Sequence, residues 1–194
     1  VGGDIAGEAA GDYLGTSVAI SGDGLRVASG APFNSIGGTA TNAGHVRVYS
    51  TDGTTWTQVG SDIDGVAGDE LGTSVSLNHA GTRLVAGGVG ANFDTGVARV
   101  FDLTGSTWSQ LGSDFDGDGA SDEFATAAAI SGDGTSVVLG APFNDTTAID
   151  AGQVQIFAYQ AIITAAATED AGLPGIYLFV AGPVGRKVLG SPVY

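Results

Sequence analysis

The pentapeptide GAPFN stands at residues 30–34 and returns unchanged at residues 140–144. A degenerate copy, GGVGANF, begins between them at Gly87, so the motif recurs in steps of 57 and 53 residues. The same two steps relate YLGTSVAIS, ELGTSVSLN and EFATAAAIS, and the later segments GHVRVYS, GVARVFD and GQVQIFA follow in the same order. Several motifs that move together along a chain indicate an internal repeat, here in three copies.

Each repeat has the pattern of four short β-strands. In the first repeat we predict them at residues 16–21, 25–31, 45–50 and 54–59, with alternation in HVRVY and Asp-Gly turns in SGDG and TDGT. Four-stranded antiparallel units repeated about every 50–60 residues are typical of propeller blades. The sequence therefore predicts an all-β fold, a β-propeller-like array of four-stranded antiparallel blades.

Three blades are predicted at about residues 1–60, 61–112 and 113–160. The tail at residues 161–194 includes GIYLFVAGPVGRKVLGSPVY, which we interpret as a degenerate partial fourth repeat or a closing or assembly segment, for about three and a half repeats in all. Its candidate assembly strand contains Ile176, Leu178 and Val180. Three outcomes stay open: a fragment, a small ring of four blades, or an incomplete array whose open edge another chain completes.

Acidic residues dominate the charge. The chain has 17 Asp and 4 Glu against 5 Arg and one Lys, a net charge of −15. Nucleic acid and anionic membranes are therefore disfavoured as partners, because both require clustered positive charge. No apolar run reaches the roughly 20 residues of a membrane span, and the absence of cysteine excludes disulfides and thiolate metal sites. The acids serve solubility alone or bind cations, and their clustering in turns favours cations.

The segments YLG…GAP and EFA…GAP resemble the FG-GAP repeat, the blade of the integrin α-subunit head and of many acidic secreted proteins of microbes and algae. The resemblance covers about residues 4–160, with Leu14, Leu71 and Phe124 at the first position of the motif. It implies an extracellular or surface-exposed protein that binds protein or glycan through loops between strands. The residues that mark these loops are Asn34, Asn42, Asn92, Asp94, Asn144, Asp145 and Asp150.

One acidic stretch, DFDGDGASD, has the spacing of the first part of a calcium loop. Carboxylates at its positions 1, 3, 5 and 9 with glycine at position 6 converge on a cation in such loops, and position 7 supplies a carbonyl. The predicted ligands are Asp114, Asp116, Asp118, Ala120 and Asp122, and a weaker equivalent set is Asp62, Asp64 and Asp69. The alternative is an Asp-rich turn whose carboxylates accept hydrogen bonds from nearby N–H groups. The calcium positions usual for FG-GAP blades, just before the GAP strand, are too short and too poor in acids here.

No catalytic residues are predicted. His45 and His79 fall at different repeat positions and have no patterned Ser or Asp partner. Trp56 and Trp108 are equivalent, which favours packing between blades over a sugar-binding platform. We therefore expect a calcium-braced extracellular structural or adhesive module. The first alternative is a subunit of an extracellular assembly (a surface filament, a flagellar hair or a virion appendage) that polymerises with itself or other subunits through its open blade edge. A carbohydrate-active hydrolase with paired carboxylates is a remote alternative.

Overall fold

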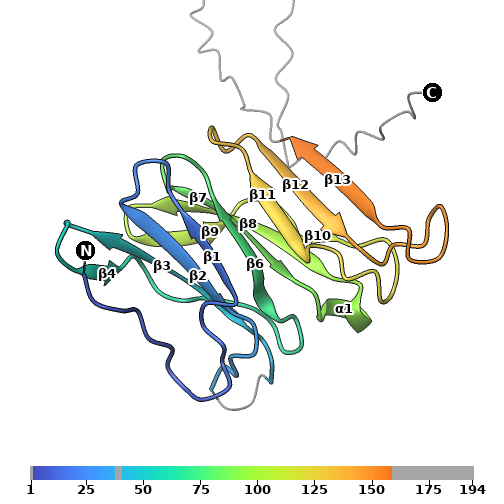
Figure 1. The fold of residues 1–194 in the computed structure, drawn as a ribbon, viewed down its shortest axis with the longest axis horizontal. Coiled ribbons are helices and arrows are strands. Elements are labelled where there is room, and N and C mark those ends of the chain that lie inside the picture. Colours follow the sequence, from blue (N-terminus) through green and yellow to red (C-terminus); the bar gives the residue numbers. More distant parts are fainter. Residues whose placement is uncertain (1, 38–40, 159–194) are drawn as a thin grey trace, which may run out of the picture.

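The computed structural model describes residues 2–37 and 41–158 of the 194-residue chain. The predicted assembly strand with Ile176, Leu178 and Val180 lies outside the described residues. Three antiparallel sheets stand side by side, as Figure 1 shows, and the all-β prediction is confirmed. No helix among the described residues is long and apolar enough to cross a membrane.

Each repeat forms one sheet, and the three sheets follow one another in chain order. The first sheet has the order β1-β2-β3-β4 with β5 also on β3, and its strands are β1 (Ser17–Ile20), β2 (Arg26–Ala31), β3 (His45–Thr51), β4 (Trp56–Gln58) and β5 (Ile63–Asp64). The second sheet places β9 and β10 on β8, and its strands are β6 (Leu71–Leu77), β7 (Arg83–Gly88), β8 (Val97–Thr104), β9 (Thr107–Gln110) and β10 (Phe115–Asp116). The described part of the third repeat supplies β11 (Ala127–Ile130), β12 (Ser136–Ala141) and β13 (Gln153–Ala158).

The segment labelled α1 (Ala91–Asp94) is a left-handed turn. Asn92, Phe93 and Asp94 have φ values of 53°, 62° and 60°. Such positive values are uncommon for residues other than glycine. The turn is held from outside, because the N–H groups of Ser121 and Glu123 donate to the carbonyls of Phe93 and Asp94 at 3.2 and 2.9 Å. The degenerate middle copy of the GAPFN motif thereby attaches the second blade to the segment that leads into the third.

The fourth strand of a blade is divided in two. β4 pairs with the end of β3, whereas β5 pairs with its beginning, so that Ile63 faces Val46. The residues GSD between them bulge out of the ladder. β9, β10 and β8 repeat this arrangement, with Phe115 facing Ala98. The ladder of the first sheet therefore runs to Asp64, beyond the boundary predicted at residue 60.

The hydrophobic core lies between neighbouring sheets, which pack face to face. We call the face that looks toward the following sheet the forward face and the opposite one the rear face. The apolar positions of the forward faces are Ala28, Val46 and Val48 in the first sheet, Val85, Ala98 and Val100 in the second, and Val138, Val154 and Ile156 in the third. Those of the rear faces are Val18, Ile20 and Val27, then Val75, Leu77 and Leu84, then Ala128, Ile130 and Val137. Both faces of the middle sheet are buried, which is the packing of successive propeller blades.

Polar contacts between neighbouring blades recur at equivalent positions. Four of them come from side chains of the forward face and end on a backbone carbonyl of the next blade. The hydroxyl contacts are Ser17 Oγ to Gly72 O at 2.7 Å and Ser74 Oγ to Ala125 O at 2.6 Å, and the guanidinium contacts are Arg26 Nη1 to Gly81 O at 2.9 Å and Arg83 Nη1 to Gly134 O at 2.8 Å. One interface is thus built twice within the chain.

Candidate functional site

Each of the first two blades carries an arginine on its third strand that binds the aspartate of the bulge 15 residues later. Arg47 donates from Nε and Nη2 to the two carboxylate oxygens of Asp62, at 2.9 and 2.7 Å. Arg99 donates from the same two atoms to Oδ2 of Asp114, at 3.0 and 2.9 Å. In the third blade Gln155 occupies the equivalent position. Paired charge-assisted contacts of this kind are strong and fix the geometry of both side chains.

A second acid, from the segment that leads into each blade, completes these contacts. Glu8 pairs with Arg47, and Asp69 Oδ2 accepts from Arg99 Nη1 at 2.6 Å. In the third blade Asp118 Oδ2 accepts from Gln155 Nε2 at 3.0 Å. We call these three sets the third-strand clamps. Each clamp joins the leading segment to the third strand of the same blade, and in the first two blades also to the end of the fourth.

The acids of the predicted calcium loop contact different protein partners. Asp114 belongs to the second clamp, Asp116 is exposed in β10, and Asp118 belongs to the third clamp. Asp122 is buried and accepts from Nδ2 of Asn144 at 2.6 Å. Among the described residues, no three of these carboxylates offer oxygens within 4.8 Å of one another. Calcium binding by this loop, with the carbonyl of its exposed alanine at position 120, stays a prediction.

The electrostatics of the bulge acids follow from their partners. Burial opposes ionisation of Asp114, but hydrogen bonds from Arg99 and Gln110 hold its pKa below the ordinary value. The contact with Arg47 likewise lowers the pKa of Asp62. Burial, followed by repulsion from Asp62, raises the pKa of Asp64. Two acids of the weaker calcium set thus bind different arginines, Asp62 the arginine of the first clamp and Asp69 that of the second.

One group of metal-type ligands does come together. Atoms of Glu8, His45 and Asp62 lie within 4.8 Å of one another, the only such group among residues 2–37 and 41–158. The guanidinium of Arg47 contacts both carboxylates, so it already supplies the cation. His45 is buried, and burial together with the charge of Arg47 lowers its pKa, which favours the neutral imidazole. We interpret the group as part of the first clamp.

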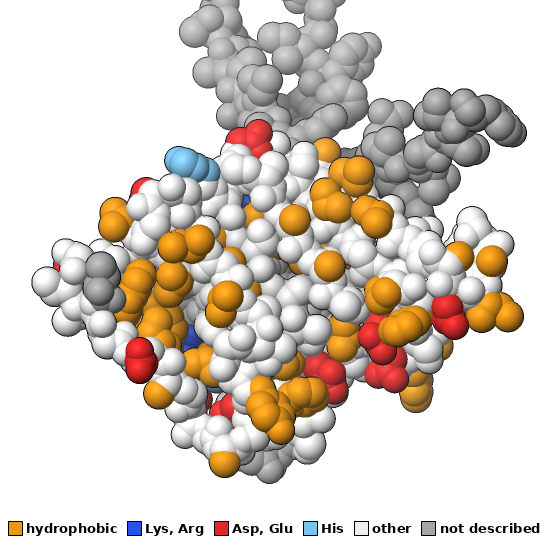
Figure 2. Space-filling model, viewed as in Figure 1, with side chains coloured by type: hydrophobic (Ala, Val, Ile, Leu, Met, Phe, Trp, Pro, Cys, Tyr) orange, Lys and Arg blue, Asp and Glu red, His pale blue; other side chains and the backbone are white. Residues whose placement is uncertain are grey.

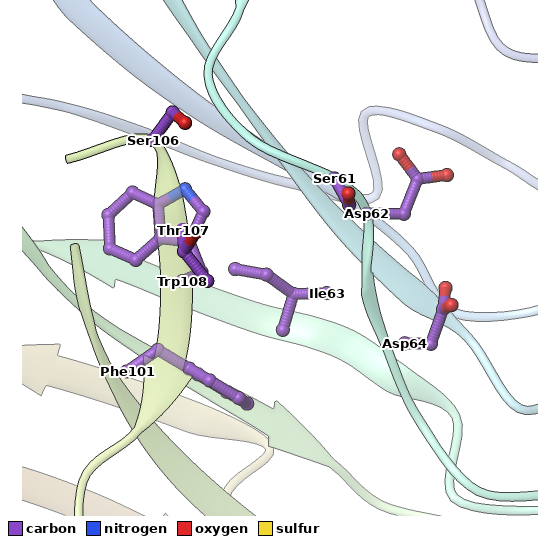
Figure 3. Close-up of a pocket in the computed structure, with 8 residues that line it drawn as sticks. All are labelled: Ser61, Asp62, Ile63, Asp64, Phe101, Ser106, Thr107 and Trp108. Atoms are coloured by element: carbon purple, nitrogen blue, oxygen red, sulfur yellow. The ribbon is translucent and has the colours of Figure 1, made fainter. Parts of the chain in front are cut away.

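A narrow cleft separates the first two blades at their outer edge (Figure 3). In the figure Ile63 points toward Trp108 and Phe101, whereas Asp62 and Asp64 turn away from the indole. Trp108 Nε1 donates to the carbonyl of Val59 in the preceding blade at 3.0 Å. The prediction that this tryptophan packs between blades is confirmed.

The predicted ligand-binding loops gather at one end of the blades, at the lower edge of Figure 1. Two of the predicted residues, Asn34 and Asn144, are buried. Asn34 donates to Asp12 at 3.0 Å, and Asn144 donates to Asp122 at 2.6 Å. The ligand contact predicted for these two side chains stays a prediction. Asn42 is half-buried, and the remaining predicted loop residues are exposed, namely Asn92, Asp94, Asp145 and Asp150.

Exposed apolar side chains accompany these loop residues, and together they form what we call the loop face. Its apolar members are Tyr13, Phe33, Phe93, Phe143 and Ile149, of which Phe93 is 90% exposed and Ile149 86%. Tyr13 and Phe33 meet edge to face with ring centroids 5.6 Å apart. Acidic side chains gather over α1 in Figure 2. Burial, then the charges of Asp94 and Glu123, raise the pKa of Glu70 beside them.

Sequence reasoning missed both the clamps and the apolar part of the loop face. A signal for the clamps was present, because arginine and the bulge aspartate are separated by 15 residues in both of the first two blades. The exposure of the apolar loop side chains has no signal of its own in the sequence. Phe33 and Phe143 belong to the repeated GAPFN motif, which indicated only the repeat.

Comparison with known proteins gives the fold and nothing finer. No family model matches the chain, and no curated protein does. Among solved structures, a "putative 6-phosphogluconolactonase" from Bacteroides uniformis is similar with a TM-score of 0.51 and 12% identity, over 76% of this chain and 37% of that one. TolB from Acinetobacter baumannii gives 0.45 and 12%, over 76% and 30%, and the β-propeller domain of the Trilobed protease from Pyrococcus furiosus gives 0.43 and 12%, over 73% and 39%.

The chain thus spans between 30% and 39% of the length of these structures. The β-propeller-like array of antiparallel blades predicted from the repeats is confirmed by the three successive sheets and by the cores between them. The narrower resemblance to FG-GAP blades stays a prediction, since no family model matches.

Proposed function

We propose that the chain is part of an extracellular structural or adhesive module that binds a protein or a glycan through its loop face. The proposal rests on a contrast between two groups of side chains, the paired polar side chains in the interior and the exposed apolar side chains of the loops. Buried acids and amides form hydrogen bonds within the protein, in the clamps and in pairs such as Asp122 with Asn144. Phe93, Phe143 and Ile149 instead project from the loops with no cover from the described residues.

The chemistry of this face fits both partner classes. Aromatic rings stack on the apolar faces of sugars and fill pockets of protein partners, and exposed apolar clusters on loops mark interaction sites. The carboxylates around α1 accept hydrogen bonds from hydroxyl groups or attract cationic side chains. The same charge repels phosphate backbones, in agreement with the net charge of −15.

Retention on immobilised supports tests this proposal. Chitin, cellulose and alginate serve as glycan probes, and gelatin as the protein probe. We expect retention on at least one support, and a double change of Phe93 and Phe143 to alanine weakens it roughly tenfold, which corresponds to about 1.4 kcal/mol. Leu25→Ala is the matched control, because Leu25 is half exposed but lies in the β1–β2 turn, away from the loop face. Equal loss in the control, or no retention on any support, would contradict the proposal.

A further inference from the structure

The described array ends in two apolar faces that have no cover among the described residues. On the rear face of the first blade Val18 is 71% and Ile20 63% exposed. On the forward face of the third blade Val154 is 68% and Ile156 50% exposed. Figure 2 shows hydrophobic side chains over β1 and β2 on one side and over β12 and β13 on the other. A soluble chain rarely leaves two such patches open.

These two faces are the two halves of an interface that the chain already builds twice. Val18 and Ile20 are equivalent to Val75 and Leu77, which are buried against the first blade. Val154 and Ile156 are equivalent to Ala98 and Val100, which are buried against the third blade. The rear face of the first blade is therefore shaped for the forward face of a preceding blade, and the third blade has such a face free.

The first described residues already imitate the outer strand of a preceding blade. Gly2 lies against Trp56 as Gly60 lies against Trp108: a Cβ on either glycine would stand 2.7 or 3.1 Å from Cδ1 of the indole, and φ is positive at both. The following residues, GDI, align with SDI after Gly60. Together with β1 and β2 they line an open apolar cleft of about 560 Å³. By this equivalence Ile5 stands where Ile63 stands, on a strand that pairs with the third strand of the blade before.

We propose that a second copy of this chain docks head to tail on the first. The forward face of its third blade packs on the rear face of the first blade, and residues 2–6 add antiparallel to its β13. Among the described residues β13 is an edge strand paired only with β12, so its outer side is free for strand addition. Two copies joined in this way at both ends make a ring of six blades, within the range of about 4–8 known for propellers.

A second copy supplies both missing faces at once. The third blade carries a forward face and the first blade a rear face of the kind that the chain pairs twice within itself. The copy–copy interface differs from those within the chain in one respect. Ala127 and Ser136 stand where Ser17 and Arg26 donate to the next blade, so this contact rests on apolar burial and strand pairing.

Cysteine cross-linking tests the register directly, because the chain has no cysteine of its own. In the two blades with the complete ladder, Ile63 faces Val46 and Phe115 faces Ala98 as direct Cα partners. Opposite residues of this kind are about 4.5–5.5 Å apart, within the range that a disulfide spans. We expect a mixture of an Ile5→Cys chain and a Val154→Cys chain to form a disulfide-linked pair under mild oxidation.

The matched control is a chain with Ile149→Cys in place of the Val154→Cys chain. Ile149 is 86% exposed but lies in a loop outside the proposed contact. Its pair with Ile5→Cys is expected to form at least about tenfold more slowly, because no docking holds the thiols together. A charge in the interface, Ile156→Asp, is expected to slow the specific cross-link by a similar factor, whereas Val66→Asp on an exposed loop does not. Equal rates for both cysteine pairs, or a cross-link indifferent to Ile156→Asp, would overturn the proposal. A longer head-to-tail polymer with the same specific cross-link would support the contact.

Discussion

Replacing Arg99 by methionine tests whether the clamps stabilise the blades. The change keeps an apolar stem but removes three hydrogen bonds, two to Asp114 and one to Asp69. The side chains of Arg99 and Asp69 are only 12% and 10% exposed, whereas that of Asp114 is 35% exposed. Removing one partner of a buried ion pair costs about 3–5 kcal/mol and an exposed pair contributes less than about 1 kcal/mol. We therefore expect a loss of about 2–4 kcal/mol at neutral pH.

Urea unfolding followed by tryptophan fluorescence measures this loss. Arg26→Met is the matched control. The Arg26 side chain donates to the neutral carbonyl of Gly81, and losing this bond is expected to cost about 1 kcal/mol. The hydrogen bonds from Arg99 and Gln110 prevail over burial in lowering the pKa of Asp114, so its contribution is present above the unfolded pKa and is lost as the pH falls through the folded one. The difference in free energy of unfolding between wild type and Arg99→Met should accordingly narrow as the pH falls below the usual range of an aspartate. Equal destabilisation by the two variants at neutral pH would refute the reasoning.

Three further predictions concern the backbone, a buried pair and calcium. Gly72→Ala should cost more than about 2 kcal/mol by thermal unfolding, because φ is 99° and the new Cβ would stand 2.7 Å from a backbone carbonyl oxygen. Gly15→Ala is the control, with a φ of 97° but open space around the new Cβ, and it should cost only about 1 kcal/mol. Equal costs for the two variants would contradict the close approach at Gly72. Asn144→Ala should cost about 1–3 kcal/mol because it leaves the buried carboxylate of Asp122 without this donor, and a neutral result would show that water replaces it. If DFDGDGASD binds calcium as the sequence predicts, a millimolar concentration should raise the melting temperature by more than about 2 °C, and a chelator should reverse the rise. A smaller change would indicate that the contacts of these acids with protein partners exclude the ion.

The blades were predictable because their signals are local. Asp-Gly turns, alternation in HVRVY and the GAPFN motif each depend on a few neighbouring residues. The same signals recur in the same order along the repeats, which strengthens the prediction. Strand boundaries in the first repeat agree with the prediction within one residue, apart from β4, which begins two residues late at Trp56. The extension of the sheet to Asp64 was not predictable in this way, because β5 is defined only by its pairing with a strand 17 residues earlier.

The candidate site was predictable only in part, because the protein partners of the acids in DFDGDGASD could not be predicted from their spacing. The spacing was interpreted as if the segment were a free loop, with carboxylates able to turn toward one centre. In the folded chain Asp116 is fixed in a ladder, and Asp114 is drawn to an arginine from another strand. The buried state of Asn34 and Asn144 is likewise tertiary, because each depends on an aspartate 22 residues earlier. The spacing of residues along the chain does not reveal which of them will form hydrogen bonds with side chains from a neighbouring strand.

The mass of the chain in solution tests most directly the central claim that the three-blade array presents two complementary end faces. One chain has a mass of 19.1 kDa. Light scattering behind a sizing column, over a range of concentrations, should show a species of about twice that mass that reverts toward one chain in Ile156→Asp but not in Val66→Asp. A chain that stays at the mass of one copy at every concentration, with its two tryptophans half-buried as in the folded state, would contradict the account.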